Sequence, residues 1–399
     1  MDLVKNSFIG VENSRIIYAG EEKPSHSSRT SELILNGKGL IAIPGLIDAH
    51  THFGDSAAKD TGIGSTLDQL VHPIHGLKTK LLKETPELEL ENAMRATAEA
   101  MLASGITTIA DFREAGLRGV QLARKALNST KLRAVILGRP SYHFEKSKVT
   151  DDSARLKEEV INELKRTIEL GNGLGISGSN EYTNRALQQI SEIAKGERKI
   201  LAVHASESEQ SRRFSLKTFG RGEVDRVLDY LKPNFLVHLT NSDENERQRI
   251  AKEHIPVVCC PRTNSVLGLG LPPITELLDL GVTVALGSDN VMLSSPDMFR
   301  EMDYASRTIR ATRRDPGAVS SRDVLSMATI NGARALGLDS ELGSISRGKK
   351  ADIVFLDTNG KNLQFSRDPI ASIVHRAGPE DVRCVMVDGE VAHGSIPKT

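Results

Sequence analysis

Short apolar segments alternate with helix-forming stretches through the middle of the chain, and this alternation restricts the possible fold more than any other feature. One apolar segment ends at His50, and seven others are residues 107–110, 132–137, 174–177, 200–203, 235–237, 256–260 and 283–286. Eight strands that alternate with helices fit a (β/α)8 TIM barrel of the α/β class. An open doubly wound sheet would need a glycine-rich nucleotide loop after an early strand, and the sequence has none.

Two of the separating stretches have clear helical patterns. Residues 89–103 are rich in Ala, Glu, Met and Leu, and residues 151–170 have an apolar residue at every fourth position from Leu156 to Ile168. The sequence Asp151-Asp152-Ser153 is typical of a helix N-cap. We therefore predict that the second helix begins there.

The two ends of the chain differ from this middle. They contain short apolar stretches broken by glycine and polar turns, namely residues 33–35, 40–43, 351–356 and 384–387. We expect a small β-sandwich domain built from residues 1–43 and 344–399, and a barrel domain at residues 44–343.

Composition excludes several classes of function. Lys plus Arg and Asp plus Glu both number 52, so no net basic charge is available to attract nucleic acid or an anionic membrane. No apolar run approaches the roughly 20 residues of a membrane span. The N-terminus lacks the pattern of a secretory signal, so we expect a cytoplasmic protein. Cys259, Cys260 and Cys384 lie in apolar runs and are expected to be buried free thiols.

A His-x-His pair stands at the end of the first barrel segment. Side chains at positions i and i+2 of a strand point to the same side, so His50 and His52 present two imidazoles to one point. Imidazole is a common ligand of zinc and iron. Taken alone, the pair is as readily a solvated strand end as a metal site.

Other strand ends carry residues of the same kind. In such barrels, functional side chains lie at the carboxyl ends of the strands. His204, His238 and Asp289 each follow an apolar segment, and Asp111 follows another. Coincidence at so many strand ends is improbable, so the pattern favours a metal-dependent enzyme.

These segments resemble the amidohydrolase superfamily, in particular the branch of cytosine, guanine and S-adenosylhomocysteine-type deaminases and triazine chlorohydrolases. The matching residues span nearly the whole chain in the right order and are 44–52, 105–108, 204–207, 237–238, 260–264, 281–290, 328–333 and 343–354.

The resemblance implies a site with one divalent metal ion, Zn²⁺ or Fe²⁺, which makes water acidic enough to act as a nucleophile. Its ligands would be His50, His52, His204 and Asp289, and Asp289 would also accept the proton of the water. His238 would orient that water. Members with two metals have a lysine after the fourth strand, and residues 174–180 contain none.

Glu207 completes the implied machinery. The His204-x-x-Glu207 spacing resembles a deaminase pattern in which the glutamate moves a proton to a ring nitrogen. This predicts a hydrolytic deaminase that releases ammonia from a small heterocyclic substrate, an amino-substituted purine, pyrimidine or related N-heterocycle. A cyclic amide (imidazolone-type) hydrolase, a chlorohydrolase and a non-catalytic scaffold remain alternatives. Asp111 is expected to order its strand end and not to bind metal.

The segment between the first two strands departs from the family pattern, so the substrate cannot be copied from relatives. Candidate substrate contacts, each of which could equally form a surface ion pair, are His75, Lys78, Arg113, Glu114 and Arg262. A cluster of Lys78, Arg113 and Arg262 would suit a carboxylate or phosphate on the substrate. We also expect a homo-oligomer.

Overall fold

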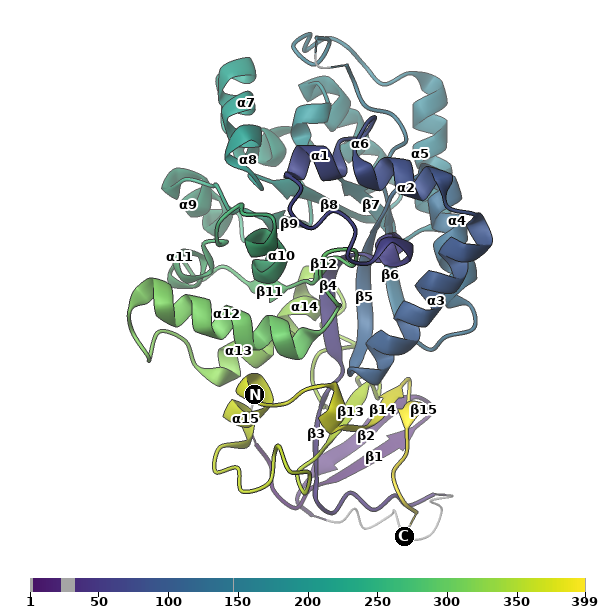
Figure 1. Cartoon of the computed structure of the whole chain (residues 1–399), viewed down its shortest axis with the longest axis vertical. Helices are drawn as coiled ribbons and strands as arrows, with labels where there is room; N and C mark the ends of the chain where they lie inside the picture. The colour runs from purple at the N-terminus through teal and green to yellow at the C-terminus, as the bar shows by residue number, and fades with distance from the viewer. Residues whose placement is uncertain (1–2, 23–32, 146, 399) are drawn as a thin grey trace.

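The computed structural model describes residues 3–22, 33–145 and 147–398. At its centre lies a curled parallel sheet with the strand order β11-β10-β9-β8-β7-β6-β5-β4-β12 (Figure 1). Its strands are β4 (Leu46–His52), β5 (Ile106–Arg113), β6 (Arg133–Gly138), β7 (Gly173–Ile176), β8 (Ile200–Ala205), β9 (Phe235–His238), β10 (Val257–Cys259), β11 (Val284–Leu286) and β12 (Asp289–Asn290). The predicted TIM-type barrel is confirmed, and its eight predicted strands are β4 to β11.

The short strand β12 brings the end of the barrel sequence beside its beginning. Asp289 and Asn290 pair in parallel with Thr51 and His52 of β4. Gly287 lies in the break between β11 and β12, and a Cβ there would be only 2.7 Å from the carbonyl oxygen of His50. Because backbone atoms cannot move aside as a side chain can, only glycine allows this close approach.

Helices cover the outside of the sheet. They are α1 (Leu67–Val71), α2 (Leu77–Glu84), α3 (Glu87–Ala103), α4 (Gly116–Leu127), α5 (Glu158–Leu170), α6 (Asn184–Gly196), α7 (Glu209–Phe219), α8 (Glu223–Arg226), α9 (Glu244–Lys252), α10 (Pro261–Val266), α11 (Ile274–Asp279), α12 (Met298–Arg313), α13 (Ser321–Met327) and α14 (Ile330–Ala335), with short turns η1 (Phe53–Ala58), η2 (Ser179–Glu181) and η3 (Val227–Leu231). In Figure 1, α1 and α2 lie at the end of the barrel away from the small sheets.

The predicted start of α5 was wrong. The helix begins at Glu158, where Glu158 and Glu159 place negative charge at the positive end of the helix dipole. The Asp151 carboxylate instead accepts a hydrogen bond from the backbone amide of Ser153 at 3.0 Å. A cap-like sequence can close a local turn as well as begin a helix, because both satisfy the same backbone donors. The apolar positions Val160, Leu164 and Ile168 do face the core.

Both ends of the chain contribute to a small antiparallel unit below the barrel (Figure 1). One sheet has the order β15-β14-β13-β3, and β1 pairs with β2 in another. The bounds of these elements, with a helix and a turn nearby, are β1 (Phe8–Glu12), β2 (Arg15–Gly20), β3 (Leu40–Pro44), β13 (Ile353–Asp357), α15 (Pro369–His375), η4 (Pro379–Asp381), β14 (Val382–Val387) and β15 (Glu390–Gly394). Ile16 of β2 is buried with Ile353 of β13, so the two sheets share a core.

One expected strand of this unit is absent, and part of the unit lies outside the described residues. Residues 33–35 form no strand, and Leu35 makes only an isolated bridge to Lys398. Part of the expected N-terminal segment, residues 1–2 and 23–32, lies outside the described residues. The domain boundaries at 43/44 and 343/344 stay predictions.

The described residues include no helix that is long and apolar enough to cross a membrane. Cys259, Cys260 and Cys384 are all buried and free, as predicted. Localisation and oligomeric state stay predictions.

Candidate metal centre and active site

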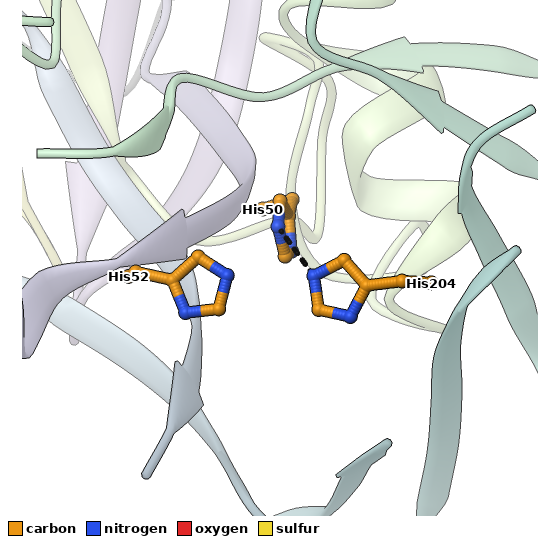
Figure 2. Close-up of side chains that lie close together, drawn as sticks. All are labelled: His50, His52 and His204. Carbon is orange, nitrogen blue, oxygen red and sulfur yellow. Dashed lines mark hydrogen bonds between the residues drawn. The ribbon is translucent and has the colours of Figure 1, made fainter. Parts of the chain in front are cut away.

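Three histidines from two strands point toward one another at the carboxyl end of the barrel. His50 and His52 come from β4 and His204 from β8, and Figure 2 shows their rings converging. The Nε2 atoms of His50 and His204 are 3.2 Å apart. Asp289 joins them from β12, with its Oδ1 3.3 Å from Nε2 of His50 and 3.5 Å from Nε2 of His52. The structure therefore brings together the four residues predicted as metal ligands.

Hydrogen bonds on the far side of two rings fix which nitrogen faces the centre. Nδ1 of His204 donates to the carbonyl oxygen of Ile176 at 3.1 Å, and Nδ1 of His52 donates to Oε1 of Glu114 at 2.8 Å. A carbonyl and a carboxylate can only accept, so each Nδ1 carries the hydrogen. The Nε2 lone pairs of both rings are left to face inward, as metal coordination requires.

Burial keeps this donor set in the protonation state that a metal needs. Burial lowers the pKa of His50 to about 3 and holds the pKa of His204 well below its usual value. Burial opposes ionisation of Asp289, but the hydrogen bond from His50 and the nearby histidines outweigh it and lower the pKa of Asp289. At neutral pH His50 and His204 are thus neutral imidazoles beside a carboxylate. Burial and Lys78 oppose protonation of His52, but Glu114 and Asp289 outweigh them, so the pKa of His52 is raised.

The donor set fits a divalent cation on three grounds. The Nε2 atoms of His50 and His204 are only 3.2 Å apart, so a hydrogen or a cation must lie between them, and a cation would bind both nitrogens together with Oδ1 of Asp289. Oδ2 of Asp289 is buried and has no hydrogen-bond partner within the described ranges. Moreover, the side chains around the centre include more carboxylates than cations. The cations are Lys78 and Arg113, and the carboxylates are Asp55, Asp111, Glu114, Glu207 and Asp289.

His238 and Glu207 stand beside the four ligands. His238 is fully buried, and the side-chain amide of Asn264 donates to its Nδ1 at 3.2 Å, so the ring proton is on Nε2. That Nε2 lies 3.7 Å from Oε1 of Glu207. Burial raises the pKa of Glu207, although the neighbouring His238 opposes this. A carboxyl group with a raised pKa is suited to give and take protons near neutral pH.

Two of these residues have a backbone conformation that non-glycine residues rarely adopt. His238 has a φ of 76° and Asp289 a φ of 62°, both in the left-handed region. Such conformations cost of order 1–3 kcal/mol and persist where the surrounding structure holds them in place. At the ends of β9 and β12, the turn of the backbone directs both side chains to the centre.

A cavity of about 420 Å³ opens beside the histidines. Its wall includes His52, His204, Glu207 and Asp289, and α1 and α2 contribute Val71, Lys78, Thr79, Leu82 and Lys83. The far wall carries polar side chains that the sequence analysis did not single out, namely Arg139, Ser141, His143, Ser177 and Glu181. Arg139 directly follows β6 and Ser177 directly follows β7, so their position after a strand was the signal that could have found these two.

The predicted substrate contacts divide into two groups. Lys78, Arg113 and Glu114 line the cavity, but His75 and Arg262 do not. His75 is exposed and stacks on His72 with ring centroids 3.5 Å apart. Arg262 instead pairs with the buried Glu301 at 3.0 Å.

The expected cationic cluster of Lys78, Arg113 and Arg262 is therefore wrong. Lys78 pairs with Asp55 and Glu114, and Arg113 pairs with Glu114, so their charges are matched within the protein. The physical reason is that a buried cation requires a partner, and the chain provides carboxylates three or fewer residues from His52 and Arg113.

Two positioning residues were missed. Asp48 precedes His50 by two residues and Asn264 contacts His238. Asp48 could have been found from the sequence, because it lies two residues before His50 on β4, and its side chain therefore points to the same side of the strand as His50 and His52. Asp111, as expected, orders its strand end, since its Oδ1 accepts a hydrogen bond from the backbone amide of Phe53 at 3.0 Å.

A parallel barrel with three histidines and an aspartate at its carboxyl end, next to a glutamate and a further histidine, defines the class of hydrolases that activate water at a metal ion. Within that class, the chain belongs to the amidohydrolase family, whose model matches residues 41–392. It is accordingly a hydrolase that acts on carbon–nitrogen bonds.

Individual relatives agree with this family. An uncharacterized protein of Methanocaldococcus jannaschii is 36% identical, with 95% of this chain and 96% of the relative covered. A 5-methylthioadenosine/S-adenosylhomocysteine deaminase of Acetivibrio thermocellus is 27% identical, with 98% of this chain and 90% of the relative covered.

Solved structures show the same fold. An adenosine deaminase from Xanthomonas campestris with bound zinc has a TM-score of 0.83 at 21% identity, covering 97% of this chain and 88% of its own. The zinc-complexed atrazine chlorohydrolase of Arthrobacter aurescens has a TM-score of 0.81 at 20% identity, with 96% and 90% covered. A guanine deaminase from C. acetobutylicum with bound guanine has a TM-score of 0.83 at 18% identity, with 98% and 95% covered.

Proposed function

We propose that this protein is a hydrolytic deaminase that releases ammonia from an amino-substituted purine, pyrimidine or related N-heterocycle. The observation that carries the proposal is the position of Glu207. This partly exposed carboxyl group lines the same cavity as His52, His204 and Asp289, and its Oε1 lies 3.7 Å from His238. Deamination needs such an acid, because a heterocycle becomes electrophilic only when its ring nitrogen is protonated.

We assign one divalent metal ion, zinc with iron as the alternative, to His50, His52, His204 and Asp289. When bound there, the metal supplies a Lewis acid that makes water a nucleophile near neutral pH. Three histidines and one carboxylate suit zinc or iron, and zinc occupies two of the structures with this fold.

The protein side chains then divide the proton transfers. Asp289 accepts the proton of the attacking water, and Glu207 delivers a proton to the ring nitrogen next to the attacked carbon. The Nε2–H of His238 donates a hydrogen bond to the oxygen that bonds to this carbon. The carbon–oxygen bond forms, and the proton held by Asp289 then passes to the exocyclic amine, so that the carbon–nitrogen bond breaks and the amine leaves as ammonia. The hydroxyl proton of the attacked carbon returns to Glu207 as the carbonyl group forms.

The cavity supports a small-molecule substrate. Its volume of about 420 Å³ lies within the usual range of ligand pockets. Apolar side chains of Leu82, Leu90, Met94 and Leu122 line part of it, together with the polar groups described above. A flat heterocycle with a polar substituent matches such a wall.

Ammonia release tests this proposal. Zinc-loaded protein is incubated with a panel of aminopurines, their nucleosides and aminopyrimidines, and ammonia is measured by a coupled assay. We expect release with at least one member of the panel, and release slower by roughly two to four orders of magnitude with the Glu207→Gln variant. A fully metal-loaded protein that releases no ammonia from any member contradicts the assignment.

Other measurements on the same samples test the alternative functions. Chloride release from chlorinated triazines would indicate a chlorohydrolase, and loss of ring absorbance without ammonia would indicate a cyclic amide hydrolase. Purified protein with less than about 0.2 equivalents of metal after metal-replete expression would indicate a non-catalytic scaffold.

A further inference from the structure

We infer that Glu114 is a positioning residue that sets the tautomer and the orientation of His52, and that Lys78 and Arg113 hold Glu114 in place for this task. The inference rests on the metal centre of the proposed function and assigns a role to side chains outside the ligand set. It also explains the buried charges of Lys78, Arg113 and Glu114 without a role in substrate binding.

The first observation is the contact between Glu114 and His52. Oε1 of Glu114 lies 2.8 Å from Nδ1 of His52, and both side chains are about 90% buried. The carboxylate requires the hydrogen on Nδ1, and Nε2 is then directed at Oδ1 of Asp289, 3.5 Å away. A buried acceptor on one ring nitrogen thus presents the lone pair of the other nitrogen to the metal position.

The second observation is that Glu114 is itself held from two sides. The ammonium group of Lys78 contacts its Oε1, and the guanidinium group of Arg113 contacts its Oε2. Lys78 and Arg113 are about 5% exposed, so neither ion pair is screened by water. Two cations on one carboxylate keep it ionised and restrict its rotation, which fixes the acceptor that His52 needs.

The local backbone is shaped to accept this arrangement. A Cβ at Gly54 would lie 1.8 Å from Nη1 and 1.9 Å from Nη2 of Arg113. The guanidinium group therefore lies directly over the backbone of Gly54, two residues after His52. Lys78 also contacts Asp55 at 3.1 Å, on the residue after Gly54.

One consequence concerns the segment that covers the cavity. Lys78 belongs to α2, which lines the cavity together with α1. Through Glu114, the docking of α2 is coupled to the orientation of a metal ligand. The sequence between β4 and β5 thus contributes to the metal centre as well as to the wall of the cavity.

The test compares metal affinity and coordination in the folded protein. The zinc dissociation constant of the full chain and of Glu114→Gln is measured by competition with a chromophoric chelator, and visible spectra are recorded after cobalt substitution. The amide oxygen of Gln still accepts a hydrogen bond but has no charge. We expect about 10–100-fold weaker zinc binding in Glu114→Gln and an altered cobalt spectrum.

Glu91→Gln is the matched control. Glu91 is also a buried glutamate, and it pairs with Arg95 and Lys125 on the outside of the barrel, not with a histidine. This variant should keep the zinc affinity and the cobalt spectrum of the unmodified chain, even where its unfolding temperature falls.

The outcomes separate this inference from the proposed function. If the unmodified chain binds zinc and Glu114→Gln binds it within twofold with the same cobalt spectrum, the role of Glu114 is refuted while the metal centre stands. If the unmodified chain binds no divalent metal, the metal centre itself is refuted. Should Glu114→Gln fail to fold, Lys78→Met replaces it, and an unchanged zinc affinity in that variant overturns the inference.

Discussion

Ser288 donates two hydrogen bonds to the carboxylate of Asp48, one from its backbone amide at 2.8 Å and one from its hydroxyl at 2.5 Å. The two residues are 240 positions apart in the sequence. Asp48 lies on β4 two residues before His50, and Ser288 directly precedes Asp289. This contact therefore joins β4 to the segment before β12, next to the proposed metal ligands His50 and Asp289.

The first prediction concerns the pH dependence of stability. Burial raises the pKa of Asp48 to about 7, although the hydrogen bonds from Ser288 oppose this. The folded protein then holds this proton more tightly than the unfolded chain does. Stability from Asp48 is present below pH 3.8 and is lost as pH rises toward 7, by up to about 4 kcal/mol.

Metal-free Asp48→Asn should therefore show a flatter unfolding temperature between pH 4 and about 7 than the metal-free unmodified chain. Metal is removed because its affinity itself depends on pH. The exposed Asp339 provides the control, since Asp339→Asn should retain the original slope. Parallel curves for Asp48→Asn and the unmodified chain would show that Asp48 does not titrate in this range.

Glu207→Gln should retain the fold and the metal but lose turnover. The amide cannot transfer a proton to the ring nitrogen, so kcat should fall by roughly two to four orders of magnitude. Steady-state kinetics on the substrate found in the ammonia screen measures this, with metal content determined on the same sample. Turnover near that of the unmodified chain would mean that another acid supplies the proton.

His238→Ala should separate water activation from metal binding. His238 lies beside the ligands but is assigned to the attacking oxygen, so its removal should leave about one metal per chain and lower kcat by about two to four orders of magnitude. Elemental analysis and kinetics together decide this. Loss of the metal in His238→Ala would instead make His238 a ligand.

Gly287→Ala should disrupt the packing of the segment between β11 and β12 against β4. The added methyl group would meet the backbone of His50 at 2.7–2.9 Å, and neither strand can move without breaking its pairing. We expect the free energy of unfolding to fall by about 1–3 kcal/mol or more, with weaker zinc binding. Gly196→Ala is the control, because a Cβ at Gly196 meets nothing within 4 Å. Denaturant titrations of both variants that coincide with the unmodified chain would contradict the argument.

Removal of the metal should destabilise the protein. Carboxylates outnumber cations around the centre, and a divalent ion offsets much of that excess. At a free zinc concentration 100 times the dissociation constant, binding stabilises the folded state by about 2.7 kcal/mol. A chelator should therefore lower the unfolding temperature of the unmodified chain but not that of Asp289→Asn. An equal effect on both proteins would locate the stabilising metal elsewhere.

The sequence by itself determined the barrel and the strand ends at which the candidate site residues lie. Alternation of strands and helices requires a covered parallel sheet, and the carboxyl ends of its strands must lie on one face. His50, His52, His204, His238 and Asp289 could therefore be grouped without coordinates, because each ends or follows an apolar strand, and the resemblance to the family proposed four of them as metal ligands. The start of α5 could not be predicted in this way, because the sequence Asp151-Asp152-Ser153 can accept hydrogen bonds from backbone amides in a turn as well as at the start of a helix.

Only the tertiary structure decided how the charges near the cavity are paired. Lys78, Arg113 and Arg262 are equally basic in the sequence, but the first two are matched by Asp55, Glu114 and Asp111, and Arg262 is matched by Glu301. Arg113 pairs with carboxylates that are close to it in the sequence, but the pairs of Lys78 with Glu114 and of Arg262 with Glu301 join separate segments of the chain. Periodicity and spacing report only on neighbours along one element, so they place a side chain on a face of the barrel but do not give its partner.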